Sequence, residues 1–341
     1  MSTLHAKAYR DIEGVENVGI VTRNYGSSEQ LATSLGGDIP RFTNFEKAIA
    51  ETSPDAIAIG TYTDSHYDYV KRGLELGLHV FVEKPLAETM EECRELFQLA
   101  KEKKRILYVG YILMTHPSWS KFIELSHDLG KPLAMRMNLN QQAKGEFLNT
   151  LKNIMQIQSP LVDCGVHYVD IMCQMAQCKP VRVHAVGCNN WDKVPQSICN
   201  YGQLQIEFED GSVGWYEAGW GPNMSETAYF IKDVVGPKGA VSIRVDSDRS
   251  DDKDHHVEAN TLIKHHAEQV DNEFVHEDEV MKIDEPDHEG LALLEQEEFI
   301  NCIRNDACMA SHEERVMTSL EIVFAADQSI AEKQVIELNL K

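Results

Sequence analysis

The chain has 341 residues, a net charge of -23 and a hydrophobic share of 43%. Such an excess of negative charge repels phosphate backbones and anionic lipid, which argues against nucleic acid and membrane surfaces as partners. The length predicts two domains whose cores need no disulfides. The eight cysteines form no CxxC pair, and there is neither a membrane-spanning apolar run nor a leader at Met1, so we expect a cytoplasmic protein with reduced thiols.

Residues 1–112 alternate short β-branched runs with amphipathic helical stretches, which is typical of a parallel sheet with helices on both faces. The expected strands are residues 18–21, 56–59, 79–82 and 106–109. Residues 88–103 form the expected helix between the last two, with acidic residues early and lysines late, as the helix dipole favours. The first domain is therefore predicted to be an α/β domain over 1–112.

The start of this domain is unusual for a dinucleotide-binding unit. Such a unit opens with a strand and a GxGxxG turn whose amides hold the pyrophosphate at a helix N-terminus. Residues 1–10 already read as the helix that follows that turn, and the first glycine is Gly14. Loss of this central strand would leave two apolar strands without a partner between them. Two explanations stay open: the start of the sequence lies too far downstream, or ordinary cofactor binding has been lost.

Residues 113–341 change to strands of period two. Apolar and polar residues alternate in 135–140, 181–186, 203–208 and 241–245. One apolar and one polar face predict a large open, mostly antiparallel sheet covered by helices on one side. Asp210-Gly211 predicts a hairpin turn between 203–208 and 213–218. The uncovered face would meet water or another subunit, and we favour a homo-oligomer, a dimer or tetramer.

Residues 246–289 are rich in Asp, Glu and His, with histidine pairs at 255–256 and 265–266. Histidine pairs can ligate transition metals, but nothing in the pattern shows that the ligands converge. We therefore favour a solvated insertion over a metal site and expect no metal.

The strand at 79–82 ends in Glu83-Lys84-Pro85. Ligands of open α/β sheets bind at the carboxyl ends of strands, and a charge placed there is costly unless a site needs it. Lys84 is thus a candidate functional residue. The alternative is an exposed loop lysine, since short motif matches are common.

A second constellation lies in residues 161–172, LVDCGVHYVDIM. If this stretch is helical, Asp163 and His167 lie four apart on one face, with Asp170 three further along. A histidine can move the proton of an alcohol near neutral pH, and a carboxylate one turn away can orient its ring. Lys84 could add a cation that steadies a developing alkoxide. The alternative is a helix-capping aspartate with a core histidine.

Together these motifs resemble the Gfo/Idh/MocA family of sugar and inositol oxidoreductases, from HAKAYR through EKPLA and DCGVHYVD to the final helix. The family pairs a Rossmann domain with an α/β domain built on a large open sheet. The resemblance implies that Lys84, Asp163 and His167 are catalytic, with His167 as general base for a secondary alcohol and a nicotinamide as hydride acceptor. It also implies that Glu83, Lys84 and Pro85 lie beside the cofactor, with the Lys84–Pro85 bond often cis.

The resemblance extends to TYTDSH at 61–66, which corresponds to the family's TPNxxH and gives Thr61 and His66 a cofactor-side role. The alternative is an ordinary strand-to-helix loop. Cofactor choice is read after the strand ending at Val21. Thr22, Arg23 and Asn24 stand there in place of the acidic residue that binds the ribose of NAD, so NADP is slightly favoured over NAD. Arg23 could equally be a solvated surface residue.

A family arginine near the substrate has no counterpart in YILMTHP at 111–117, where Met114 stands in its place. This departure puts ordinary sugar specificity in question. Tyr111, His116 and Tyr168 are the candidate pocket residues, and each could equally serve packing.

Three functions follow from these features. The first is an NAD(P)-dependent dehydrogenase or reductase that acts on a secondary alcohol or ketone of a sugar, inositol or sugar derivative. The second is a glycosidase or lyase that keeps its nicotinamide bound. The third is a non-catalytic binding or regulatory homologue that has lost the cofactor. The first is favoured because lysine, aspartate and histidine would be easily replaced once unused.

Overall fold

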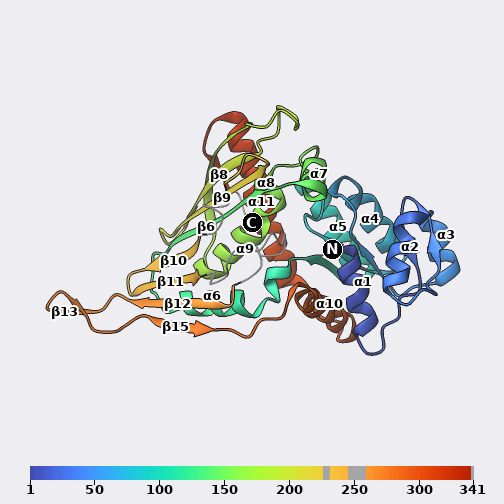
Figure 1. Ribbon diagram of the computed structural model, residues 1–341, viewed down its shortest axis with the longest axis horizontal. Coiled ribbons are helices and arrows are strands. Elements are labelled where there is room, and N and C mark those ends of the chain that lie inside the picture. Colours follow the sequence, from blue (N-terminus) through green and yellow to red (C-terminus); the bar gives the residue numbers. More distant parts are fainter. Residues whose placement is uncertain (226–230, 245–258, 339–341) are drawn as a thin grey trace. The chain divides into compact units, whose positions relative to one another are not determined.

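The computed structural model describes residues 1–225, 231–244 and 259–338. The chain divides into two compact units, of which unit 1 contains Met1–Thr115 and Pro286–Glu313 and unit 2 contains His116–Glu285 and Glu314–Lys341 (Figure 1). Residues 286–313 thus join the first unit although they follow the second unit's sheet in the sequence. No helix in the described ranges has the length and apolar character needed to cross a membrane.

Unit 1 alternates helices and short strands, as the sequence predicts. Its helices are α1 (Ser2–Asp11), α2 (Tyr25–Ser34), α3 (Phe45–Thr52), α4 (His66–Glu75), α5 (Met90–Lys103) and α10 (His288–Arg304), with 3₁₀ turns η1 (Thr63–Ser65) and η2 (Ile112–Met114). Its strands are β1 (Ile20–Val21), β2 (Arg41–Phe42), β3 (Ala56–Ile59), β4 (His79–Glu83) and β5 (Leu107–Gly110).

The sheet of unit 1 consists of two separate parallel pieces. One is the pair β1-β2 and the other is β3-β4-β5, so β1 pairs only with β2 and β3 only with β4 among the described strands. The prediction that two strands would lack a partner between them is confirmed. Helix α1 contacts the hydrophobic clusters of both pieces, through Ala6 beside Ile20 and through Tyr9 beside Phe81.

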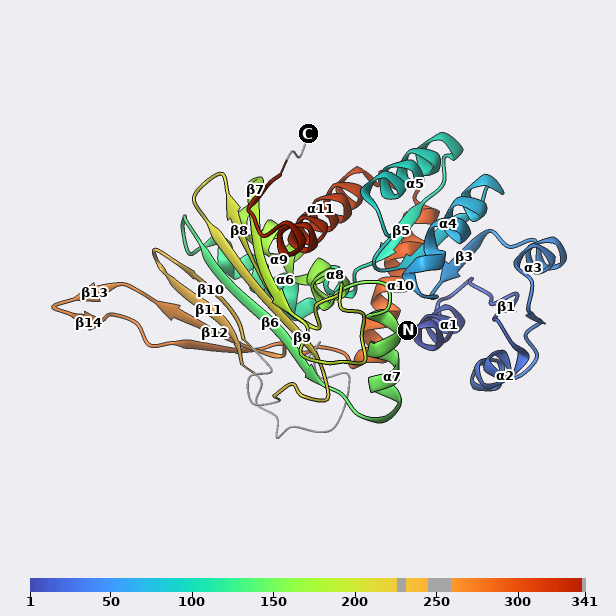
Figure 2. The same ribbon diagram turned by 90° about the horizontal axis from the view of Figure 1, so that it is seen from above.

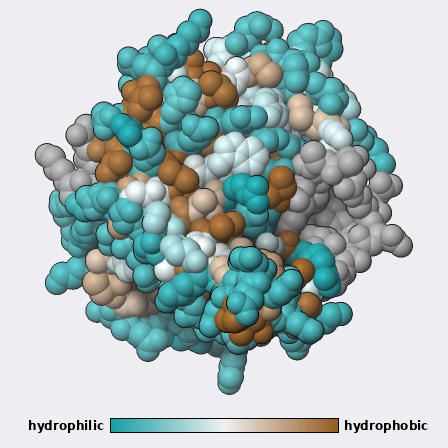
Figure 3. All heavy atoms as spheres, turned by 90° about the vertical axis from the view of Figure 1, so that its left-hand side faces the viewer, coloured by the Kyte–Doolittle hydropathy of each residue, from teal (hydrophilic) through white to brown (hydrophobic). Residues whose placement is uncertain are grey.

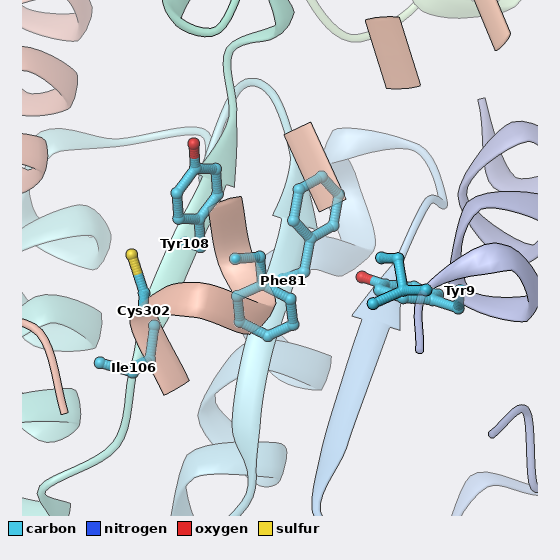
Figure 4. Packing of buried hydrophobic residues seen from close by; sticks show 7 residues of the cluster. Tyr9, Phe81, Ile106, Tyr108 and Cys302 are labelled. Atoms are coloured by element: carbon cyan, nitrogen blue, oxygen red, sulfur yellow. The ribbon is translucent and has the colours of Figure 1, made fainter. Parts of the chain in front are cut away.

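The core of unit 1 is centred on Phe81 of β4. Its ring is fully buried, lies 6.0 Å from the Tyr108 ring and 5.8 Å from the Phe299 ring of α10, and is seen between Tyr108 and Tyr9 in Figure 4. A Cβ at Gly110 would lie 2.7 Å from this ring. The return of α10 to unit 1 therefore completes the core beneath the end of β4, where Lys84 follows.

Unit 2 is built on a nine-stranded sheet of order β15-β12-β11-β10-β6-β9-β8-β7-β16 (Figure 2). The strands are β6 (Ala134–Gln142), β7 (Pro180–Cys188), β8 (Tyr201–Phe208), β9 (Val213–Gly221), β10 (Lys232–Gly236), β11 (Gly239–Arg244), β12 (Thr261–His266), β15 (Glu279–Lys282) and β16 (Ile336–Glu337). Only the pair β6-β9 is parallel among these neighbours. The predicted large, mostly antiparallel sheet is confirmed.

One face of this sheet is covered by helices, as Figure 2 shows for α6 (Pro117–His127), α9 (Gly165–Ala176) and α11 (Ala310–Glu332). Two shorter helices, α7 (Gly145–Ile154) and α8 (Pro160–Asp163), complete the unit. The covered face holds the apolar members of each alternation, such as Val183 and Ala185 of β7, while Val186 is 54% exposed. Strands β8 and β9 are joined at the predicted Asp210-Gly211 turn, where Gly211 has a φ of 83°.

The expected solvated insertion over 246–289 is partly wrong. Strands β12 and β15 extend the edge of the large sheet, and β13 (Gln269–Val270) with β14 (Glu273–Phe274) forms a hairpin beyond them. Each histidine of the 265–266 pair contacts a carboxylate across the ribbon, His265 with Asp278 and His266 with Glu279. His255 and His256 lie outside the described residues. Across the described part of the chain, no group of three His, Cys, Asp or Glu side chains could hold a metal ion.

Candidate active site

Lys84 follows the last residue of β4, where Glu83 pairs with Gly110 of β5. Its side chain is partly buried, and the Lys84–Pro85 peptide is cis, as the resemblance implies. Because β3, β4 and β5 are parallel, Lys84 lies at the edge of the sheet where open α/β domains bind their ligands.

His66 ties this turn to the neighbouring loop. Its Nδ1 lies 2.8 Å from the carbonyl oxygen of Pro85 and its Nε2 lies 3.1 Å from that of Thr61. The ring is 1% exposed, and burial lowers its pKa although both carbonyls oppose the shift. The Thr61 hydroxyl accepts a hydrogen bond from Ser65 at 2.8 Å. His66 therefore holds the Pro85 backbone, and its ring is not exposed.

The Glu83 carboxylate points into unit 1. It is 8% exposed, and its Oε1 lies 2.5 Å from Nε2 of His5 on α1. Burial alone would raise its pKa, but the hydrogen bond from His5 and nearby positive charges, including Lys84, hold the pKa of Glu83 below its ordinary value. Glu83 is thus an ionised residue beneath the Lys84 turn.

The loop after β1 contains the three residues assigned to cofactor choice. Asn24 caps α2 by accepting from the Ser27 N–H at 3.1 Å, and the Thr22 hydroxyl donates to the Asn24 carbonyl at 2.6 Å. The Arg23 guanidinium lies 6.0 Å from the centre of the Tyr62 ring, at the outer limit of a cation–π contact. Thr22 and Asn24 therefore shape the loop, while Arg23 presents its charge beside Tyr62.

In unit 2 the predicted helix over 161–172 is two helices. Helix α8 ends at Asp163 and α9 begins at Gly165, with Cys164 between them. At the start of α9 the His167 N–H bonds to the carbonyl of Cys164, three residues back. Gly165 permits the close approach of α9 to the sheet, since a Cβ there would lie 3.2 Å from the Tyr216 ring.

Asp163 is buried and held from outside its own helix. Its Oδ1 accepts from the Gln158 amide at 2.7 Å, and its exposed fraction is 6%. The N-cap of α8 is Ser159, whose hydroxyl accepts from the Val162 N–H at 3.2 Å. Asp163 is therefore not the helix cap that the alternative interpretation required. His167, in the first turn of α9, is partly exposed.

Asp170, the last residue of the DxGxHxxD pattern, forms a structural ion pair. Both of its carboxylate oxygens accept from Arg315 of α11, at 3.0 and 2.6 Å. Burial raises the pKa of Asp170, against the effect of the Arg315 guanidinium. The pair joins α9 to α11, so Asp170 fixes the helix on which His167 stands.

The three candidate pocket residues are all buried. Tyr111, after β5, is 1% exposed, and His116 is fully buried and caps α6 by accepting from the Ser118 N–H at 3.2 Å.

Tyr168 stacks on Tyr216 with ring centres 5.0 Å apart. The Nζ atom of Lys232 on β10 lies 4.7 Å from the Tyr168 ring centre and donates to the Asn138 carbonyl. Tyr168 and His116 thus support the site through packing and capping.

Comparison with known proteins decides the family. The family model described as the NAD-binding Rossmann fold of the Gfo/Idh/MocA oxidoreductases matches residues 1–111, and the model of their C-terminal alpha/beta domain matches residues 126–338. The chain belongs to the Gfo/Idh/MocA oxidoreductase family. The second model also covers residues 286–313, which the structure places in unit 1.

Individual relatives are similar over most of their length. The scyllo-inositol 2-dehydrogenase (NAD(+)) of Bacillus subtilis is 25% identical to this chain. The match covers 99% of this chain and 93% of the length of that enzyme. The D-glucoside 3-dehydrogenase of Escherichia coli is 21% identical over 70% of this chain and 73% of its own. The structure of a levoglucosan dehydrogenase in complex with NADH and levoglucosan superposes with a TM-score of 0.79 at 18% identity, covering 99% of this chain and 96% of that one.

Proposed function

We propose that this protein transfers a hydride between a nicotinamide cofactor and a secondary alcohol or ketone of a sugar, inositol or sugar derivative. The observation that carries the proposal is the Asp163–His167 segment, where a buried, amide-held carboxylate precedes a partly exposed histidine by one turn in a family of oxidoreductases. The dehydrogenases of scyllo-inositol and D-glucosides among the relatives support a polyol or sugar substrate.

The proposed chemistry assigns one role to each residue. His167 takes the hydroxyl proton of the alcohol, Asp163 favours the protonated ring by its negative charge, and the Lys84 ammonium steadies the alkoxide. In the reverse direction the same residues return the proton to the ketone oxygen. Asp170 and His66 act through the elements they fix, α9 and the Pro85 turn respectively.

The residues of unit 1 fit the nicotinamide and ribose sides of a dinucleotide cofactor. Thr22, Gly60 and Lys84 follow the last residues of the parallel strands β1, β3 and β4, the type of edge that binds dinucleotides. A nicotinamide cofactor would supply the hydride acceptor or donor. Thr61, Glu83, Lys84, Pro85 and His66 would hold or shape its nicotinamide side, and the Thr22-Arg23-Asn24 loop its ribose side. We assign no residue to the pyrophosphate.

We further infer a modest preference for NADP over NAD. Arg23 can pair with the 2′-phosphate of NADP, and the loop has no carboxylate to bind the free ribose hydroxyls of NAD. The family model and NAD(+)-dependent relatives are also consistent with NAD, so the two cofactors must be compared directly.

We also propose that the uncovered face of the large sheet joins two or more copies. Val186, Val213 and Val235 are 54%, 45% and 40% exposed on β7, β9 and β10. Figure 3 shows separate apolar patches within the largely hydrophilic surface on this side of the molecule. Light scattering should give a mass of at least two chains, and a monomer at micromolar concentration would refute this part of the proposal.

The test of function compares wild type with Lys84→Met and His167→Ala against a panel of polyols and sugars. Both variants should lose at least about a hundredfold in turnover, the usual contribution of a positioned acid–base group. The exposed residues Lys103 and His184 give matched controls, Lys103→Met and His184→Ala, which should keep full activity. Product without net change in nicotinamide absorbance would instead indicate a lyase or glycosidase, and absent cofactor binding a non-catalytic homologue.

A further inference from the structure

A chain of buried hydrogen bonds runs from α1 and α10 to the residue before Lys84. The Tyr9 hydroxyl donates to the Gln296 carbonyl oxygen, and the Gln296 amide donates to Nδ1 of His5 at 2.9 Å. His5 Nε2 then lies 2.5 Å from Glu83 Oε1. All four residues are at most 9% exposed.

The order of donors gives this chain a direction. Because the Gln296 amide nitrogen can only donate, Nδ1 of His5 must accept, which places the proton of a neutral imidazole on Nε2. That proton points at the Glu83 carboxylate. Each donor along the chain therefore stabilises the negative charge at its end, and this charge lies next to Lys84 in the sequence.

A second buried carboxyl group, that of Glu295, interacts with Glu83, and its pKa is shifted in the opposite direction. Glu295 of α10 is 1% exposed, and burial together with the charge of Glu83 raises the pKa of Glu295 well above its ordinary value. Its Oε2 is 3.4 Å from the Gln296 amide, and its Oε1 has no hydrogen-bond partner among the described residues. The hydrogen-bond chain therefore favours the negative charge on Glu83 rather than on Glu295.

We propose that the Tyr9–Gln296–His5–Glu83 chain is a positioning device for Lys84. By favouring a negative charge on Glu83, it stabilises the ammonium form of the Lys84 side chain and holds the turn that carries it. Glu83 and His5 are positioning residues, since they act through Lys84. This role rests on the proposed function, in which the charged Lys84 steadies the alkoxide.

Several titratable groups face Glu83. They come from Lys84 itself, from the Met1 amino group and from neighbouring helices, namely His5 and Tyr9 on α1, His66 on α4 and Glu295 on α10. Burial and the charge of Glu83 both favour the neutral form of Glu295, so the negative charge is favoured on Glu83.

The direct test is the titration of the Lys84 side chain by NMR in protein labelled with 13C-lysine, with the signal assigned by its loss in Lys84→Met. In Glu83→Gln, which keeps an acceptor for His5 but removes the charge, the Lys84 midpoint should fall by about one pH unit. The exposed Glu88 supplies the control Glu88→Gln, which should leave the midpoint unchanged. Should Glu83→Gln not fold, Tyr9→Phe interrupts the far end and should move the midpoint in the same direction by a smaller amount.

Two outcomes separate this proposal from the proposed function. An unchanged Lys84 midpoint in both variants would overturn the positioning device even if the wild type transfers hydride. A lowered midpoint in a protein that shows no hydride transfer would support the device and refute the enzymatic role. If the Lys84 midpoint falls in Glu83→Gln and the wild type transfers hydride, the alkaline limb of the kcat/KM profile should move with the Lys84 midpoint while KM changes little.

Discussion

Replacement of Asp327 by asparagine should change how stability depends on pH. Asp327, on α11, is partly buried and its Oδ1 accepts from the Ser159 hydroxyl at 2.7 Å. Burial raises the pKa of Asp327 from an ordinary value of 3.8 to about 6, and the Ser159 hydrogen bond only partly opposes this shift. Ser159 caps α8, the helix that ends at Asp163.

The raised pKa of Asp327 determines how its contribution to stability changes with pH. A group whose pKa is higher in the folded protein contributes stability below its unfolded pKa and loses that contribution as the pH rises through its folded pKa. The difference of about 2 pH units corresponds to roughly 2 to 3 kcal/mol, the lower figure allowing for solvent contact. Asp327 should therefore cost the protein this amount at neutral pH and almost nothing at about pH 4.

The assay is urea unfolding followed by tryptophan fluorescence at several values between about pH 4.5 and pH 7.5. Asp327→Asn keeps an oxygen acceptor for Ser159 but cannot ionise, so its advantage over wild type should grow by about 2 kcal/mol across this range. Asp192, whose side chain is 79% exposed, gives the control Asp192→Asn, which should follow wild type. If Asp327→Asn and wild type gave parallel curves, the burial argument would be refuted.

Other variants test the packing around the site by the free energy of unfolding. Arg315→Met should lose about 3 to 5 kcal/mol, because it leaves the buried Asp170 carboxylate without its partner. Asp170→Asn should lose less, because the Arg315 side chain is 24% exposed, and additive losses in the double variant would contradict a shared ion pair. Lys232→Met should raise stability by about 1 kcal/mol or more, since burial lowers the pKa of Lys232 well below its ordinary value; a lower melting temperature would contradict this. Gly165→Ala should cost about 1 to 2 kcal/mol, despite the usual helix preference for alanine, because the new Cβ would press on the buried Tyr216 ring.

The strands could be predicted because local pattern determines them. Residues 56–59 form β3 as predicted, and the parallel strand ending at Glu83 extends the predicted one by one residue. The period-two alternation in residues 203–208 likewise predicted β8, since one face of an open sheet is buried. The break between β1 and β3 followed from strand order rather than from local preference.

The supporting residues of the site could not be predicted, because their partners are distant in the sequence. His5 meets Gln296 across 291 residues, and Arg315 meets Asp170 across 145. No spacing rule links such positions, and no motif marks His5, Gln296 or Arg315 as a site residue. Lys232 did carry a signal, because the alternation with the buried Val234 places it on the covered face.

Hydride transfer is measured directly by following nicotinamide absorbance while the purified protein is mixed with NADP or NAD and the panel of polyols and sugars. We expect reduction of the nicotinamide with at least one substrate, abolished in Lys84→Met and His167→Ala and kept in Lys103→Met and His184→Ala. Equal rates in wild type and in Lys84→Met or His167→Ala would contradict the assignment of these residues. No reduction with any substrate, in a protein that also fails to quench or enhance NADPH or NADH fluorescence, would contradict the enzymatic role itself.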